Sequence, residues 1–139
     1  MNIMQESDSI VIIPTYNEME NIEKIIRAVL GLEKNFHILV IDDNSPDKTG
    51  DEVERLIKTE FGGRLFIVHR SGKLGLGTAY IQGFKWALEH GYDYIFEMDA
   101  DFSHDPNDLP RLYAACHDEG YDLAIGSRYV SGVNVVNWP

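Results

Sequence analysis

The sequence predicts a single α/β domain in which a mostly parallel β-sheet is covered by helices on both faces. Short apolar runs rich in Val and Ile alternate along the chain with segments whose apolar residues recur at helical spacing. Acidic and polar clusters directly follow several of these apolar runs. The domain is expected to span residues 10–139, after a polar tail at 1–9.

The first half of the chain predicts three strands and two helices. A β-branched run at 10–13 is the first strand, which Pro14 stops. Thr15 and Glu18 have capping-box spacing before a helix at 22–30. The second strand, 37–41, is followed by turn residues and by a helical face at 53–61, and 65–68 is the third strand.

The second half predicts two more strands and two more helices. A glycine-rich loop at 72–77 leads into a helix at 78–90, and the fourth strand at 94–98 runs into Asp99-Ala100-Asp101. A helix at 107–119 and a fifth strand at 123–125 follow. Residues 130–139 carry little secondary-structure signal, so the domain is expected to be incomplete at its C-terminus.

Composition indicates which classes of binding partner and which cellular location to expect. A net charge of −11 and a pI near 4.7 disfavour nucleic acid, whose phosphates an acidic domain repels. Cys116 is the single cysteine, which excludes an internal disulfide and predicts a core residue. No apolar run reaches the ~20 residues of a membrane span. We therefore expect a cytoplasmic protein that contacts a membrane surface only through a lipid substrate or a partner subunit.

The polar clusters are expected to converge, because ligands of open parallel sheets bind beyond the carboxyl ends of the strands. Asp99 and Asp101, directly after an apolar strand, predict a magnesium or manganese site, since both cations prefer oxygen ligands. The alternative for this pair is a solvated loop that caps the following helix. Arg128 is expected to bind phosphate, or else to pair with the acidic rim.

Three further segments are candidate ligand contacts. Asp43 suits the N–H edge of a base, guanine or uracil, or else caps the next helix. Tyr16 is expected to stack on a base, and Glu18 to bond a ribose hydroxyl or complete the capping box. The glycine-rich loop is expected to approach the ligand, with Arg70 and Lys73 offering charge, or to be only a flexible turn.

The motifs together resemble the GT-A-fold glycosyltransferases of family 2, and within it the dolichol-phosphate (polyprenol-phosphate) mannosyltransferases. The matching stretches are Pro-Thr-Tyr-Asn-Glu at 14–18, Ile-Asp-Asp-Asn-Ser-Pro-Asp at 41–47, Lys-Leu-Gly-Leu-Gly-Thr-Ala-Tyr at 73–80, Met-Asp-Ala-Asp-Phe-Ser-His-Asp-Pro at 98–106 and Gly-Ser-Arg-Tyr at 126–129. The resemblance implies a GT-A fold, GDP-mannose as donor, a polyprenyl phosphate as acceptor, Mg²⁺ or Mn²⁺ as cofactor, and inversion at the sugar.

The resemblance also implies a set of site residues. Those expected at the donor nucleotide are Pro14, Tyr16, Glu18, Ile41, Asp43, Asp99, Ala100, Asp101 and Arg128. Asp101 and Arg128 are the predicted catalytic residues. Asp99 and Asp101 are the predicted metal ligands. Ser103 stands where some relatives carry a metal-binding Gln. Because serine is shorter, a water molecule is the alternative to Ser103 as the third metal ligand.

Four other functions fit parts of the pattern. A haloacid-dehalogenase-like phosphatase also uses Asp-x-Asp after a strand, and a receiver domain uses an acidic pair such as Asp42-Asp43. Both need a late lysine, but the last lysine here is Lys85. A non-catalytic nucleotide-sugar-binding module and a family 2 transferase that uses UDP-glucose or UDP-N-acetylglucosamine remain open.

Overall fold

The computed structural model describes residues 6–72, 74–118, 123–125 and 134–137, the last two ranges by their backbone only. The elements are β1 (Ser9–Thr15), α1 (Ile22–Leu30), β2 (His37–Asp42), α2 (Thr49–Leu56), β3 (Leu65–His69), α3 (Leu76–Glu89), β4 (Tyr94–Glu97), α4 (Leu109–His117), β5 (Leu123–Ile125) and β6 (Asn134–Asn137). A π-helical turn at Ile57–Phe61 continues α2, and a 3-10 turn at Pro106–Asp108 precedes α4.

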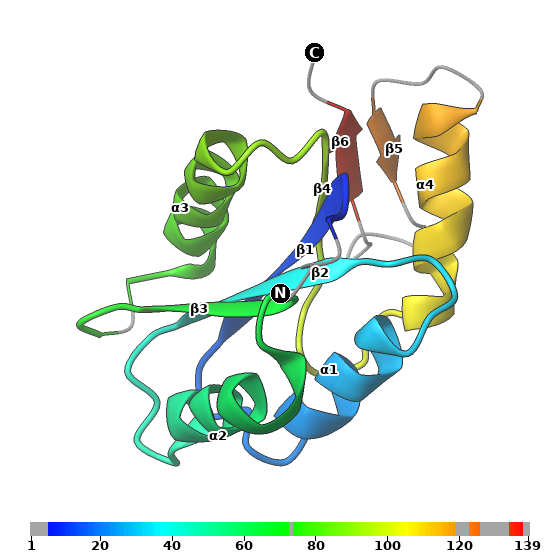
Figure 1. The fold of residues 1–139 in the computed structure, drawn as a ribbon. Coiled ribbons are helices and arrows are strands. Elements are labelled where there is room, and N and C mark those ends of the chain that lie inside the picture. Colours follow the sequence, from blue (N-terminus) through cyan, green and yellow to red (C-terminus); the bar gives the residue numbers. More distant parts are fainter. Residues whose placement is uncertain (1–5, 73, 119–122, 126–133, 138–139) are drawn as a thin grey trace.

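The strands form one sheet in the order β3-β2-β1-β4-β6-β5 (Figure 1). β1 pairs in parallel with β2 and β4, and β2 pairs in parallel with β3. β6 runs antiparallel to both β4 and β5, so β5 points the same way as the first four strands. The predicted mostly parallel sheet is confirmed. Its strand order reverses between β1 and β4, where open α/β sheets bind their ligands.

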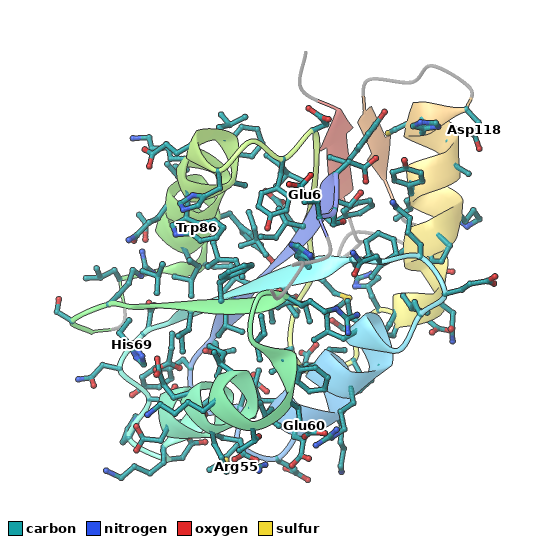
Figure 2. The ribbon with its side chains drawn as sticks, in the orientation of Figure 1. Glu6, Arg55, Glu60, His69, Trp86 and Asp118 are labelled. Atoms are coloured by element: carbon teal, nitrogen blue, oxygen red, sulfur yellow. The ribbon has the colours of Figure 1, made fainter. Side chains whose placement is uncertain are left out.

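Helices cover both faces of the sheet, as predicted (Figure 1). Val11, Ile13, Ile38 and Val40 point to one face and pack under α1, α2 and α4. Their strand neighbours point to the other face, under α3, since side chains alternate along a strand. Trp86 of α3 packs on Phe66 of β3, with ring centroids 5.3 Å apart (Figure 2).

The apolar periodicity of α1 is confirmed, because Ile22, Ile25, Ile26, Val29 and Leu30 are all buried. Cys116 is likewise buried in α4. None of the helices in the described ranges is long and apolar enough to cross a bilayer.

Pro14 lies within β1 and does not end it, contrary to the prediction. The ladder between β1 and β4 stops at the pair Ile12 and Glu97, and the Ile12 carbonyl accepts from Met98 N. Backbone groups alternate in direction along a strand, so Pro14 faces β4 where that strand has already ended. Although proline has no backbone N–H, Pro14 therefore loses no hydrogen bond to β4.

Two other expectations are wrong. β6 lies in the stretch 130–139, which carried little secondary-structure signal. A strand of four residues with two apolar members is too short to show periodicity. It forms by pairing with β4 and β5. The capping box does not form. Thr15 Oγ1 donates to Asp42 instead, and α1 begins only at Ile22.

Candidate functional site

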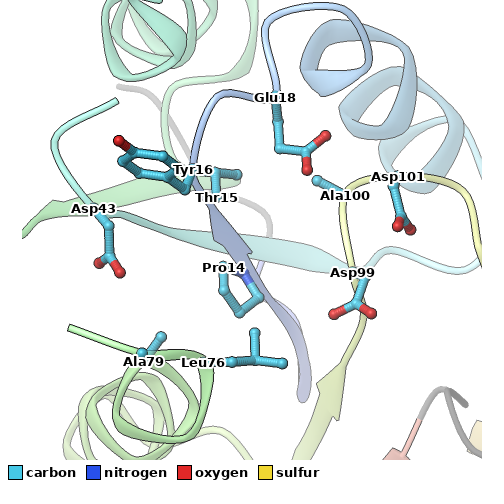
Figure 3. Close-up of a pocket in the computed structure, with 11 residues that line it drawn as sticks. Pro14, Thr15, Tyr16, Glu18, Asp43, Leu76, Ala79, Asp99, Ala100 and Asp101 are labelled. Atoms are coloured by element: carbon cyan, nitrogen blue, oxygen red, sulfur yellow. The ribbon is translucent and has the colours of Figure 1, made fainter. Parts of the chain in front are cut away.

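A pocket of about 250 Å³ lies beyond the carboxyl ends of β1, β2 and β4 (Figure 3). Seven of the predicted site residues line it, namely Pro14, Tyr16, Glu18, Asp43, Asp99, Ala100 and Asp101. Asp43 lies at one end of the pocket, and Glu18, Asp99 and Asp101 lie at the other. Segments far apart in sequence therefore meet at one rim, as the strand-end placement predicted.

Three predicted residues are not among those lining the pocket. The side chain of Ile41 is fully buried between the sheet and α3. Ser103 lies in the turn after Asp101 and contacts that carboxylate. Arg128 falls outside the described residues.

Asp43 forms a buried ion pair with Arg70. Arg70 Nε donates to Oδ1 at 2.5 Å and Nη2 to Oδ2 at 2.9 Å, and only 8% of Arg70 is exposed. The same guanidinium donates to Thr78 Oγ1 and to the Gly75 carbonyl. Arg70 therefore ties the glycine-rich loop to Asp43. Its charge is already paired, contrary to the expectation that it is offered to a ligand. Lys73 lies outside the described residues.

Asp42, the last residue of β2, has a structural role. Its carboxylate accepts from Thr15 Oγ1 at 2.7 Å, from Ser45 Oγ at 2.7 Å and from Ser45 N at 3.0 Å. Because these bonds are buried, the loops after β1 and β2 are held against each other.

The loop after β1 is held by side chains of the segment after β2. Asn17 N donates to Ser45 Oγ, Glu18 N to Thr49 Oγ1 and Met19 N to Asp47 Oδ2. These contacts fix the backbone that carries Tyr16 and Glu18. Sequence reasoning missed them, although Ser, Thr and Asp after a strand are residues that bond to nearby backbone.

The other end of the pocket is strongly acidic. Burial raises the pKa of Glu18, and the negative charges of Asp101, Asp47 and Asp99 raise it further. A hydrogen bond with Asn21 lowers this pKa and offsets part of the increase. The pKa of Asp101 lies below its usual range, because Ser103 donates hydrogen bonds to that carboxylate. The site thus concentrates negative charge that a cation would neutralise.

Tyr80 of α3 reaches the same end. Its hydroxyl donates to Asp99 Oδ1 at 2.9 Å. Burial and the negative charge of Asp99 raise the pKa of Tyr80 far above its ordinary value, so the phenol stays a donor. In the sequence Tyr80 is the last residue of the matching stretch 73–80, and it was not among the predicted site residues.

In the described part of the chain, no three His, Cys, Asp or Glu side chains stand close enough to hold a metal ion together. Sites that bind magnesium often use one or two carboxylates and take their other ligands from water and substrate phosphates. Asp99 and Asp101 fit that sparse pattern, because both line the pocket and Glu18 lies beside them.

The fold and the pocket define an α/β ligand-binding domain whose site lies at the switch point of its sheet. The model of the glycosyl transferase family 2 matches residues 10–139, and the chain belongs to that family. Family membership contradicts the phosphatase and receiver alternatives.

Two curated relatives are close in sequence. The polyprenol monophosphomannose synthase of Mycolicibacterium smegmatis is 51% identical over 131 residues, which cover 94% of this chain and 49% of that protein. The dolichol-phosphate mannosyltransferase of Pyrococcus furiosus is 43% identical over 133 residues, which cover 93% of this chain and 35% of that protein. The chain thus spans half or less of the length of these relatives.

A solved structure shows the same fold. The mannosyltransferase PcManGT from Pyrobaculum calidifontis, in complex with GDP-Man and Mn²⁺, superposes with a TM-score of 0.75 at 19% identity. The match covers 94% of this chain and 44% of that one. The predicted GT-A fold is therefore confirmed.

Proposed function

We propose that this chain binds GDP-mannose and forms the donor-binding part of an inverting transferase that moves mannose to a polyprenyl phosphate. The observation that carries the proposal is the pocket itself, which has Asp43 and Tyr16 at one end and the carboxylates of Asp99 and Asp101 at the other. Two relatives bear the names polyprenol monophosphomannose synthase and dolichol-phosphate mannosyltransferase, and these names support the choice of sugar and acceptor.

Different residues of the pocket bind different parts of the donor. Asp43, oriented by Arg70, accepts an N–H of the base, and Tyr16, which is 38% exposed, offers its ring face. Glu18 accepts a hydrogen bond from a ribose hydroxyl. Asp99 and Asp101 would hold the divalent cation, Mg²⁺ or Mn²⁺. When bound, the cation neutralises charge that develops on the departing diphosphate.

The acceptor explains why the chain needs no general base. A phosphate oxygen is already anionic and attacks the anomeric carbon directly, whereas a hydroxyl acceptor would have to lose a proton. Direct displacement inverts the anomeric centre. Arg128 is proposed to offset the repulsion between acceptor phosphate and donor diphosphate. With a lipid acceptor, transfer takes place at a membrane surface, which we propose is the cytoplasmic face.

The test is calorimetric binding of GDP-mannose with Mn²⁺, with Mg²⁺ and with EDTA. Asp101→Asn should weaken metal-dependent binding at least about tenfold, because a charge-assisted contact worth ~1.5–3 kcal/mol is lost. Asp108→Asn, which removes a charge outside the pocket, should leave the affinity unchanged.

Equal affinity with and without metal, or in Asp101→Asn, contradicts the metal assignment. UDP-glucose and UDP-N-acetylglucosamine serve as competitors. Tighter binding of either one would overturn the choice of GDP-mannose. Transfer of mannose to a polyprenyl phosphate by the longest natural chain separates a transferase from a binding module.

A further inference from the structure

α3 contacts both ends of the pocket through its first turns. Thr78 Oγ1 accepts from Arg70, the partner of Asp43, at 3.0 Å. Two residues further on, Tyr80 donates to Asp99 Oδ1 at 2.9 Å. Ala79, between them, is 1% exposed and lines the pocket, so this turn is packed in place.

The bond from Tyr80 restricts the carboxylate of Asp99. An ionised carboxylate has about four acceptor sites on two oxygens and rotates readily about χ2. A donor fixed on Oδ1 selects one orientation and leaves Oδ2 for another partner. Asp99 lies in the loop after β4, beyond the last paired residue of that strand. Strand pairing therefore does not set the orientation of its carboxylate.

From this geometry we propose that Tyr80 is a positioning residue, which orients the Asp99 carboxylate toward the cation and diphosphate of the donor. The inference rests on the proposed function, since it concerns the same pocket. Tyr80 acts through Asp99 and touches no reacting atom. Its loss should weaken metal-dependent donor binding while the fold persists, because Phe keeps the ring and its packing.

A matched control exists elsewhere in the chain. Tyr113 of α4 also donates to an aspartate, Asp8 Oδ2, at 2.7 Å, far from the pocket residues. Tyr80→Phe and Tyr113→Phe therefore each remove one tyrosine–carboxylate hydrogen bond. A general loss of stability would affect both variants, whereas a positioning role affects donor binding only in the first.

The experiment measures the Kd of GDP-mannose with Mn²⁺ and with EDTA, together with the Tm. Tyr80→Phe should raise the Kd with Mn²⁺ about five- to tenfold, which corresponds to the loss of one hydrogen bond of ordinary strength. It should leave the Kd with EDTA unchanged. Tyr113→Phe should change neither Kd. An unchanged Kd with Mn²⁺ in Tyr80→Phe, with the wild type binding metal-dependently, overturns the role of Tyr80.

A double-mutant cycle with Asp99→Asn gives the second readout. If Tyr80 acts through the Asp99 carboxylate, Tyr80→Phe adds less than twofold to the Kd of Asp99→Asn, and full additivity of the two effects overturns the inference. The cycle also holds if Tyr80→Phe lowers the Tm, since all four proteins are compared folded. A wild type that shows no metal-dependent binding contradicts the proposed function itself, which keeps the two failures distinct.

Discussion

At the scale of single residues, Asp43 and Arg70 decide how one end of the pocket is built. Two guanidinium nitrogens hold both carboxylate oxygens, and Leu74 N donates to Oδ2 at 3.3 Å. Both side chains of the pair are at least nine-tenths buried. A buried pair of this kind is costly to break, because the remaining charge is left without a partner.

Arg70→Met tests that dependence. Removing the guanidinium leaves Asp43 charged and buried, which should lower the free energy of unfolding by about 3–5 kcal/mol. Arg27 pairs with Glu60 through two nitrogens in the same bidentate manner, but its side chain is 43% exposed. Arg27→Met should therefore leave the free energy of unfolding almost unchanged, because solvent screens an exposed ion pair. Urea unfolding of both variants makes the comparison, and equal losses would contradict it.

At the scale of elements, α3 is the helix that matters most to the pocket. It lies alone over its face of the sheet among the described helices and carries Leu76, Ala79 and Tyr80 at its beginning (Figure 1). Gly83 lets it approach β1 closely, because an added Cβ would lie 2.6 Å from Ile12 Cγ2. The close distance between α3 and the sheet thus depends on glycine at position 83.

Gly83→Ala should destabilise the chain by ~1–3 kcal/mol, because overpacking against a fully buried Ile12 outweighs the gain in helix propensity. Gly77→Ala is the matched substitution in the same helix, where nothing lies within 4 Å of the added Cβ. It should stabilise by about 0.4–1 kcal/mol through the unfolded state. Thermal unfolding of the two variants should give shifts of opposite sign, and shifts of the same sign would refute the packing argument.

At the scale of the whole molecule, the fold gathers carboxylates that are far apart in sequence. Glu18 follows β1, Asp47 follows β2, and Asp99 and Asp101 follow β4. Burial and the repulsion from the other three raise the pKa of Glu18. The raised pKa is a property of the assembled domain, because no neighbouring residue in the sequence produces it.

The pH dependence of stability should reveal this charge in buffer free of divalent cations. A carboxyl whose pKa is raised by folding stabilises the chain when protonated, so its contribution falls as pH rises from the unfolded pKa through the folded one. Glu18→Gln mimics the protonated form. It should match the wild type in stability at pH 4 and be slightly more stable at pH 7, since solvent screens much of the repulsion on a partly exposed carboxylate. A variant that is less stable at pH 7 would contradict the assignment; chemical unfolding at both pH values decides it.

Most of the fold and much of the site could be predicted from the sequence, because both depend on local patterns. Apolar periodicity identified the five strands up to Ile125 and four helices, with bounds that differ by a few residues. The rule that polar residues at carboxyl ends of parallel strands converge is confirmed by Tyr16, Glu18, Asp43, Asp99 and Asp101, which line one pocket. Pro14 and Ala100 in the same pocket were expected only from the family resemblance. The resemblance of five motifs placed the chain in its family.

The sequence by itself determined the strand–helix alternation and the rim on which the site lies, since each follows from neighbours along the chain. Only the tertiary structure decided the partners. Arg70 pairs with Asp43, Tyr80 orients Asp99, Thr15 bonds Asp42 in place of a capping box, and β6 closes between β4 and β5. A side chain's partner depends on which distant segments pack together, and spacing along one chain does not specify that.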